Sequence, residues 1–125
     1  MVRQKVLYVD DEPINLELLK ISFRKEYEVI TAMSADDGLE ILEKDSDIKI
    51  IISDLRMPVM DGYEFIKTIK KKYENKICML LTGYMESEIM HEEMNRDLVF
   101  RYIVKPWRKD ELSQSIDEAF NRLNH

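Results

Sequence analysis

Four short polar segments, each placed directly after an apolar run, supply the side chains best suited to chemistry. Asp10, Asp11 and Asp54 offer hard oxygen ligands, Thr82 offers a hydroxyl and Lys105 an ammonium. Carboxylates crowded together repel one another, and their ionisation is disfavoured unless a cation is bound. Because the segments contain no His or Cys, this ligand set favours Mg²⁺, which usually keeps several of its waters.

The same side chains fit the transfer of a phosphoryl group. In that reaction the protein mainly positions the reactants and neutralises charge on the phosphoryl oxygens. Lys105 could supply the positive charge, Thr82 a hydroxyl donor, and Asp54 a covalent nucleophile. A bound Mg²⁺ would screen Asp54 from an anionic phosphoryl donor.

Each of these residues also has an ordinary structural explanation when it is considered alone. Asp10 and Asp11 could form a loop and a helix cap, and Asp54 could belong to a turn. Thr82 could be a cap, and Lys105 a solvated surface lysine. A site is indicated only by the combination of these residues, because a polar group of a suitable kind follows each of four apolar runs.

Five apolar runs predict strands, and those around Val6, Ile50 and Met79 are nearly continuous. A continuous apolar run is typical of a strand buried on both faces of a parallel sheet. Amphipathic patterns between the runs predict helices. The predicted strands span 6–9, 27–31, 48–53, 77–81 and 102–104, and the helices begin at Pro13, at Ser34 or Asp36, at Asp61 and Gly62, at Glu86 (to Met94) and at Asp110.

Five repeats of strand and helix fill residues 1–125, which indicates one domain. Right-handed crossovers between parallel strands predict an α/β fold, a flavodoxin-like doubly wound (βα)5 sandwich with a parallel five-stranded sheet of order 2-1-3-4-5. Ligands of such sheets bind at the carboxyl ends of the strands, near the switch point between strands 1 and 3. Asp10, Asp54, Thr82 and Lys105 follow strands 1, 3, 4 and 5, so we expect them to converge there.

Composition narrows the classes of function. Hydrophobic residues make up 45% of the chain and charged residues 35%, as in soluble globular proteins, and the net charge of −6 does not favour nucleic-acid binding. The lone Cys78 lies in an apolar run, which predicts a buried thiol and fits a reducing compartment. No segment approaches the roughly 18 apolar residues that span a membrane. We expect a cytoplasmic protein with no membrane partner.

The segments VLYVDDEP, IIISDLRMPVMDG, MLLTGY and YIVKPW resemble the four signature segments of bacterial response regulator receiver domains. The resemblance spans the chain from the first predicted strand to the last helix. It implies that Asp54 accepts a phosphoryl group from a histidine kinase or a histidine phosphotransfer protein. It also implies that Asp11, Asp54 and the backbone carbonyl of Arg56 ligate Mg²⁺, while Asp10 holds the metal through water.

The resemblance further implies a switch that responds to phosphorylation. Lys105 would pair with the phosphoryl group, with the Lys105–Pro106 peptide bond cis. Thr82 would move toward the new oxygens, and Tyr102 would swing inward, unless Tyr102 is simply a packed strand aromatic. The output would be a population shift in the surface of the fourth helix, fifth strand and fifth helix. That surface could carry a homodimer or simply be solvated.

Two further positions would flank the phosphoryl group in such a domain. Arg56 and Tyr84 lie two residues beyond Asp54 and Thr82, and the bulky Tyr84 would slow attack by water. On this hypothesis the Tyr84→Ala variant would lose its phosphoryl group faster.

The first predicted helix has more apolar residues than one core stripe needs. We expect Ile21 to be buried under the fifth helix. Ile14 and Leu18, near the predicted site, could dock the donor histidine protein.

Three alternatives compete with a phosphorylated receiver that catalyses only its own phosphorylation and dephosphorylation. An FMN-binding electron carrier would need a phosphate loop rich in Ser, Thr and Gly where Asp10 and Asp11 stand. An aspartyl-phosphate phosphatase would need a D-x-D pattern after the first strand, which is missing. A degenerate receiver would act as a phosphorylation-independent protein-binding module. LTGY combined with RYIVKPW is similar to receivers associated with cyclic-di-GMP phosphodiesterase (HD-GYP) or other enzymatic outputs, but the sequence leaves the output, the kinase and the oligomeric state open.

Overall fold

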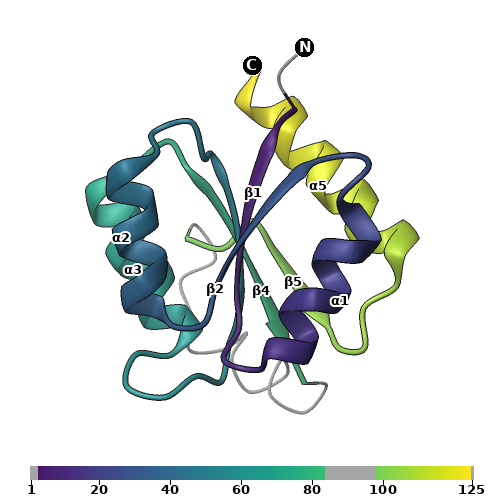
Figure 1. Ribbon diagram of the computed structural model, residues 1–125. Coiled ribbons are helices and arrows are strands. Elements are labelled where there is room, and N and C mark those ends of the chain that lie inside the picture. Colours follow the sequence, from purple (N-terminus) through teal and green to yellow (C-terminus); the bar gives the residue numbers. More distant parts are fainter. Residues whose placement is uncertain (1–2, 84–97, 125) are drawn as a thin grey trace.

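Five parallel strands form one sheet at the centre of the computed structural model, which describes residues 3–83 and 98–124 (Figure 1). The strand order is β2-β1-β3-β4-β5, which confirms the predicted order. The strands are β1 (Lys5–Val9), β2 (Glu28–Ala32), β3 (Ile50–Asp54), β4 (Ile77–Thr82) and β5 (Arg101–Val104).

Helices cover both faces of the sheet, with α1 and α5 on one face and α2 and α3 on the other (Figure 1). The predicted fourth helix lies outside the described residues. None of the described helices is long and apolar enough to cross a membrane. The helices are α1 (Pro13–Phe23), α2 (Ala35–Lys44), α3 (Gly62–Lys72) and α5 (Lys109–Leu123).

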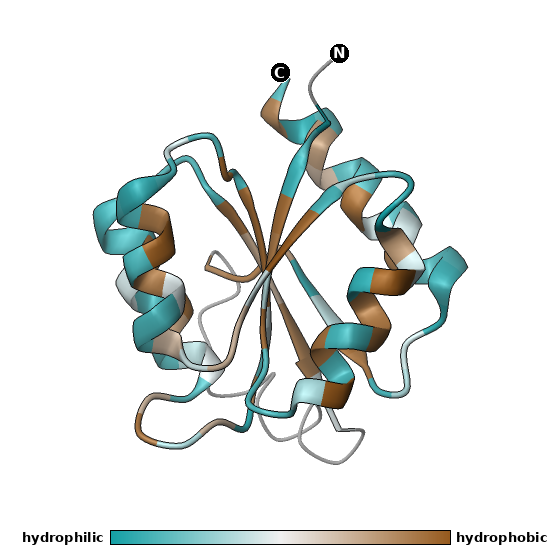
Figure 2. Ribbon diagram, in the orientation of Figure 1, coloured by the Kyte–Doolittle hydropathy of each residue, from teal (hydrophilic) through white to brown (hydrophobic). Residues whose placement is uncertain are grey.

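The continuous apolar strands explain why the sheet lies between two layers of helices. Every residue of β3 is buried, and β1 and β4 are buried except at their first residues. Alternate side chains therefore enter two separate cores, one under α1 and α5 and one under α2 and α3. In Figure 2 much of the central sheet has the brown colour of hydrophobic residues. Burying one Leu, Ile or Phe side chain contributes about 1.5–3 kcal/mol. Cys78 belongs to the second core as a buried free thiol, as expected.

Side-chain caps mark where α2 and α3 begin. The side chain of Ser34 accepts a hydrogen bond from the Asp37 N–H, and that of Asp61 accepts one from the Glu64 N–H. Such caps contribute about 1 kcal/mol each. The predicted strand boundaries are wrong by one or two residues. Ile48, for example, is fully buried but precedes β3, because burial extends beyond the hydrogen-bonded ladder.

The outer face of α1 differs from the prediction. Its buried stripe runs from Leu16 to Phe23, whereas Ile14, Leu18 and Ile21 are 79%, 56% and 53% exposed. The prediction that Ile21 is buried under α5 is therefore wrong. With 3.6 residues per turn, these three side chains lie on the side of the helix opposite its buried stripe.

Candidate functional site

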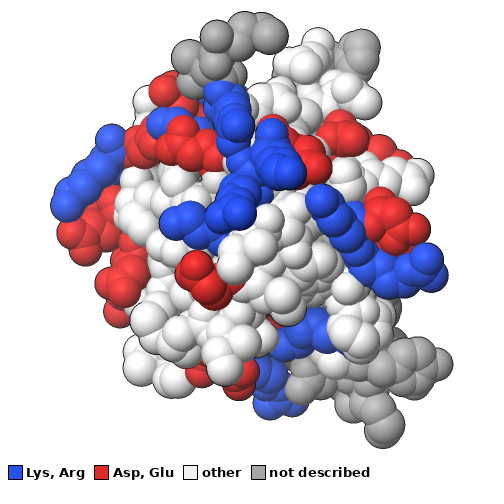
Figure 3. All heavy atoms as spheres, turned by 45° about the vertical axis from the view of Figure 1, so that its right-hand side comes forward, with Lys and Arg blue, Asp and Glu red and all other residues white. Residues whose placement is uncertain are grey.

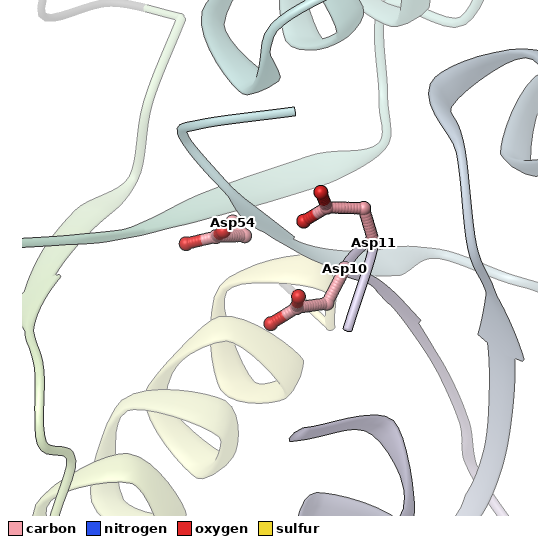
Figure 4. A group of neighbouring side chains, drawn as sticks. All are labelled: Asp10, Asp11 and Asp54. Atoms are coloured by element: carbon pink, nitrogen blue, oxygen red, sulfur yellow. The ribbon is translucent and has the colours of Figure 1, made fainter. Parts of the chain in front are cut away.

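The carboxyl ends of β1 and β3 bring three carboxylates together. One ligand oxygen each from Asp10, Asp11 and Asp54 lies within 4.8 Å of the others (Figure 4). Asp10 is completely buried and Asp54 is 5% exposed. The close spacing follows from the pairing of β1 with β3, which places Val9 beside Ser53 and so brings the residues that follow them to the same edge.

Lys105 adds a positive charge to the acidic cluster. Its Nζ donates a hydrogen bond to Asp54 Oδ1 at 2.6 Å. The backbone positions this side chain, because the Lys105 N–H donates to the Thr82 carbonyl at 2.8 Å and continues the pairing of β5 with β4. The Lys105–Pro106 peptide bond is cis, as the family resemblance implied.

The electrostatic environment disfavours the ionised form of Asp54. Burial raises the pKa of the Asp54 carboxyl, and the neighbouring Asp10 and Asp11 charges act in the same direction. The hydrogen bond and charge of Lys105 lower this pKa but do not cancel the effect of burial. A divalent cation among these oxygens would favour the ionised carboxylates. The donor set, three carboxylates with no His or Cys among them, fits Mg²⁺.

Thr82 places a hydroxyl at the same edge of the sheet. The side chain is completely buried, and its Oγ1 lacks a hydrogen-bond partner among the described residues. A buried polar group left without a partner costs about 1–3 kcal/mol, so native structures rarely keep one without a reason. This hydroxyl is available to a ligand oxygen bound beside Asp54.

Two hydrogen bonds hold the buried carboxylate of Asp10. The Tyr8 hydroxyl donates to Asp10 Oδ2 at 2.6 Å, and the Glu12 N–H donates to Oδ1 at 2.9 Å. Burial and the bond to Asp10 raise the pKa of Tyr8 well above its usual range, so its hydroxyl stays a donor. Sequence reasoning missed Tyr8. The two-residue alternation of a strand was the available signal, because it places residues 8 and 10 on the same side.

A glycine allows α3 to approach the end of β3. A Cβ at Gly62 would lie 2.2 Å from the Asp54 carbonyl oxygen, which is closer than any side chain allows. The Gly62 N–H donates to the Leu55 carbonyl at 2.8 Å. Only glycine permits this contact, which fixes the loop that follows Asp54.

The predicted roles of three further residues, Arg56, Tyr102 and Tyr84, are not tested by the structure. Arg56 is exposed in the loop after β3, and Tyr102 on β5 is half-buried against the core under α2 and α3. Tyr84 lies outside the described residues. The structure thus brings together Asp10, Asp11, Asp54 and Lys105, and leaves the roles of these three as predictions.

Val59, in the loop between Asp54 and α3, adopts a strained backbone conformation. Its φ of 71° lies in the left-handed region, which β-branched residues avoid, and its side chain is 98% exposed. The side chain gains nothing from burial that could offset the strain.

Replacing Val59 with Asn is expected to raise the free energy of unfolding by about 1 kcal/mol, because Asn tolerates the left-handed region and strain there costs about 1–3 kcal/mol. Urea denaturation would measure the change. Val59→Thr is the matched control, since it makes the side chain polar but keeps the branched Cβ, and should give no gain. Equal stabilisation by both variants would attribute the effect to polarity instead of backbone strain.

The sequence matches the family model of the response regulator receiver domain over residues 6–117. The chain belongs to this family. Receiver domains are generally regulatory rather than metabolic enzymes. The family binds Mg²⁺ at an acidic pocket, and this receiver has a cluster of three Asp residues.

Similar proteins cover nearly all of this receiver. The hydrogenase transcriptional regulatory protein HoxA of Bradyrhizobium diazoefficiens is 32% identical over 118 residues, which are 94% of this chain and 24% of HoxA. The chain thus spans about a quarter of the length of this curated relative. The response regulator TrrA of Thermotoga maritima, solved in complex with Mg²⁺ and BeF, is 30% identical with a TM-score of 0.83, covering 93% of this chain and 98% of TrrA. The signal receiver domain of an HD domain-containing protein from Pseudomonas fluorescens Pf-5 is 26% identical with a TM-score of 0.89, covering 98% of both chains.

Proposed function

We propose that this receiver accepts a phosphoryl group on Asp54 in a Mg²⁺-dependent reaction, with a histidine kinase or a histidine phosphotransfer protein as donor. The observation that carries the proposal is the Asp54 carboxylate itself, buried beside two other carboxylates and bonded at 2.6 Å to the Lys105 ammonium. The hydroxyl of Thr82, which has no hydrogen-bond partner in the part of the chain that the structure describes, supplies a donor for a further oxygen.

Each side chain has a separate part in the transfer. A carboxylate oxygen of Asp54 attacks the phosphorus, the bond from phosphorus to the donor imidazole nitrogen breaks, and the electron pair leaves with that nitrogen. Lys105 and Thr82 neutralise and bind the transferred oxygens. Asp11, Asp54 and the Arg56 carbonyl would hold Mg²⁺, with Asp10 bound through water. The cation would supply charge neutralisation at the phosphoryl oxygens.

The conformational output follows from the new oxygens on Asp54. Thr82 would turn its hydroxyl toward them, and Tyr102 would move into the space that Thr82 leaves, shifting the population of conformations at β5 and α5. Arg56 and Tyr84 would flank the phosphoryl group and set its lifetime. This change would control an output domain or a protein partner. One form of partner is a second copy of the receiver, in a homodimer through β5, α5 and the fourth helix that the sequence predicts.

The donor protein would dock on the exposed apolar face of α1. This helix begins two residues after Asp11, and Ile14 and Leu18 are largely exposed on it. In the view of Figure 3, which brings the side of α1 and α5 forward, positive and negative side chains are interspersed around uncharged surface (Figure 3). An exposed apolar face on a helix that begins close to Asp11 suits a transient protein complex.

Leu18→Glu is expected to slow phosphotransfer from the donor protein about tenfold, because the loss of one apolar contact weakens docking by about 1.4 kcal/mol. Radiolabelled transfer from the phosphorylated histidine protein would measure the rate. Uptake from acetyl phosphate is the control and should not change, because a small donor needs no docking surface. Equal slowing of both reactions would contradict docking on α1.

The test of the proposed function is the intact mass of the protein after incubation with Mg²⁺ and acetyl phosphate. A gain of one phosphoryl group is the expected result. A folded protein that gains no mass and binds no beryllium fluoride would instead favour the degenerate receiver, a phosphorylation-independent binding module.

A further inference from the structure

Asp10 is the most deeply buried carboxylate of the acidic cluster, and its position depends on few contacts. It is completely buried, whereas Asp11 is partly exposed. The Asp10 N–H donates to the Ala32 carbonyl at 3.1 Å and fixes the backbone. The carboxylate itself accepts one bond from the Glu12 N–H and one from the Tyr8 hydroxyl.

Tyr8 lies in the core under α1 and α5, and its hydroxyl contacts Asp10 from that core. Its side chain is 1% exposed and belongs to that core, while its hydroxyl lies at 2.6 Å from Asp10 Oδ2. A phenylalanine would fill nearly the same space in the core but would offer no donor. The hydroxyl is therefore the one feature of this residue that core packing does not require.

We propose that Tyr8 is a positioning residue of the metal site, whose hydroxyl orients the Asp10 carboxylate toward the cation. This inference rests on the proposed Mg²⁺ site. The Tyr8 hydroxyl occupies one lone pair of Oδ2 and the Glu12 N–H one of Oδ1, so rotation of the carboxylate breaks both bonds. The remaining lone pairs keep a fixed direction in which to bind a water of the metal.

The Tyr8→Phe variant is expected to raise the Kd for Mg²⁺ severalfold, up to about tenfold. Loss of a partner of a direct ligand typically weakens metal binding 10–100-fold, and Tyr8 acts one step further out, on a carboxylate that holds the metal through water. The Kd would be measured on metal-free protein by titration with Mg²⁺ alone, followed by amide chemical shifts, with no phosphodonor. Tyr27→Phe is a matched control. Tyr27 is also a buried tyrosine, and its hydroxyl donates to Asp117, a carboxylate outside the cluster. The Kd of the Tyr27→Phe variant for Mg²⁺ should equal that of wild type.

A double-mutant cycle distinguishes positioning from a general effect on the core. If Tyr8 acts through Asp10, Tyr8→Phe should not weaken Mg²⁺ binding further in an Asp10→Ala background. An equal loss in both backgrounds would overturn the inference. In wild type, the ring signals of Tyr8 should respond to Mg²⁺ with the same Kd as the Asp10 amide, and those of Tyr27 should not. This readout needs no variant, so it holds even if a substitution impairs folding.

The results separate this inference from the proposed function. Mg²⁺ binding by wild type with an unchanged Kd in Tyr8→Phe overturns only the role of Tyr8. A wild-type protein that binds no Mg²⁺ overturns both.

Discussion

Replacing Asp54 with Asn is expected to reduce phosphoryl uptake from acetyl phosphate at least about 100-fold, to below detection by intact mass. The amide has nearly the shape of the carboxylate but lacks its negative charge and is a poor nucleophile. The Asp54 Oδ1 lies at 2.6 Å from the Lys105 ammonium, which would neutralise the transferred oxygens. Intact mass after incubation with Mg²⁺ and acetyl phosphate would measure the loss.

Asp47→Asn is the matched control for this variant. Asp47 is an exposed carboxylate in the loop before β3, at the other end of the strand that carries Asp54. Its loss should leave uptake unchanged. If Asp54→Asn still gained one phosphoryl group, another side chain would be the acceptor. Sensitivity of the adduct to hydroxylamine, which cleaves acyl phosphates, would then show whether the new acceptor is a carboxylate, as Asp10 and Asp11 are.

The sheet order was predictable because burial on both faces leaves a continuous apolar run in the sequence. The runs around Ile50 and Met79 belong to β3 and β4 in the middle of the sheet. The outer face of α1 was not predictable in the same way. An apolar residue such as Ile21 satisfies the pattern of a buried helix, yet it is 53% exposed. The pattern of apolar residues alone does not distinguish a second buried stripe of a helix from an exposed apolar surface.

The acidic cluster was predictable because it needs only the strand order. Once β1 lies beside β3, residues at the carboxyl ends of these strands must meet, and Asp10, Asp11 and Asp54 do. The contacts and the loop conformation around the acidic cluster could not be predicted from the strand order. The bond from Tyr8 to Asp10 depends on a side-chain rotamer inside the core, and the strain at Val59 depends on a single backbone angle. The alternation of the strand places residues 8 and 10 on the same side but does not show that their side chains are bonded. No residue pattern marks the backbone angle at Val59.

Removing Mg²⁺ with EDTA is expected to slow phosphoryl uptake at least about 100-fold, since a bound metal ion contributes several kcal/mol to neutralising transition-state charge. Without the metal, three carboxylates whose ligand atoms lie within 4.8 Å of one another would repel the anionic donor. The ammonium of Lys105, which is bonded to Asp54, would offset part of this repulsion. The initial rate of mass gain in Mg²⁺ and in EDTA would measure the difference. An equal rate in EDTA would mean that Lys105 alone suffices to screen the cluster.

Thermal unfolding would test the same site without any phosphoryl donor. Ligand binding to the folded state should stabilise wild type by about 1.4 kcal/mol when Mg²⁺ is at ten times its Kd. Asp11→Asn should lose most of this gain, because Asp11 supplies one oxygen of the cluster. Asp47→Asn, which removes an equal charge elsewhere, should keep it. If Asp11→Asn kept the full stabilisation, Mg²⁺ would act by general screening of a chain with a net charge of −6. The acidic cluster would then not be the metal site.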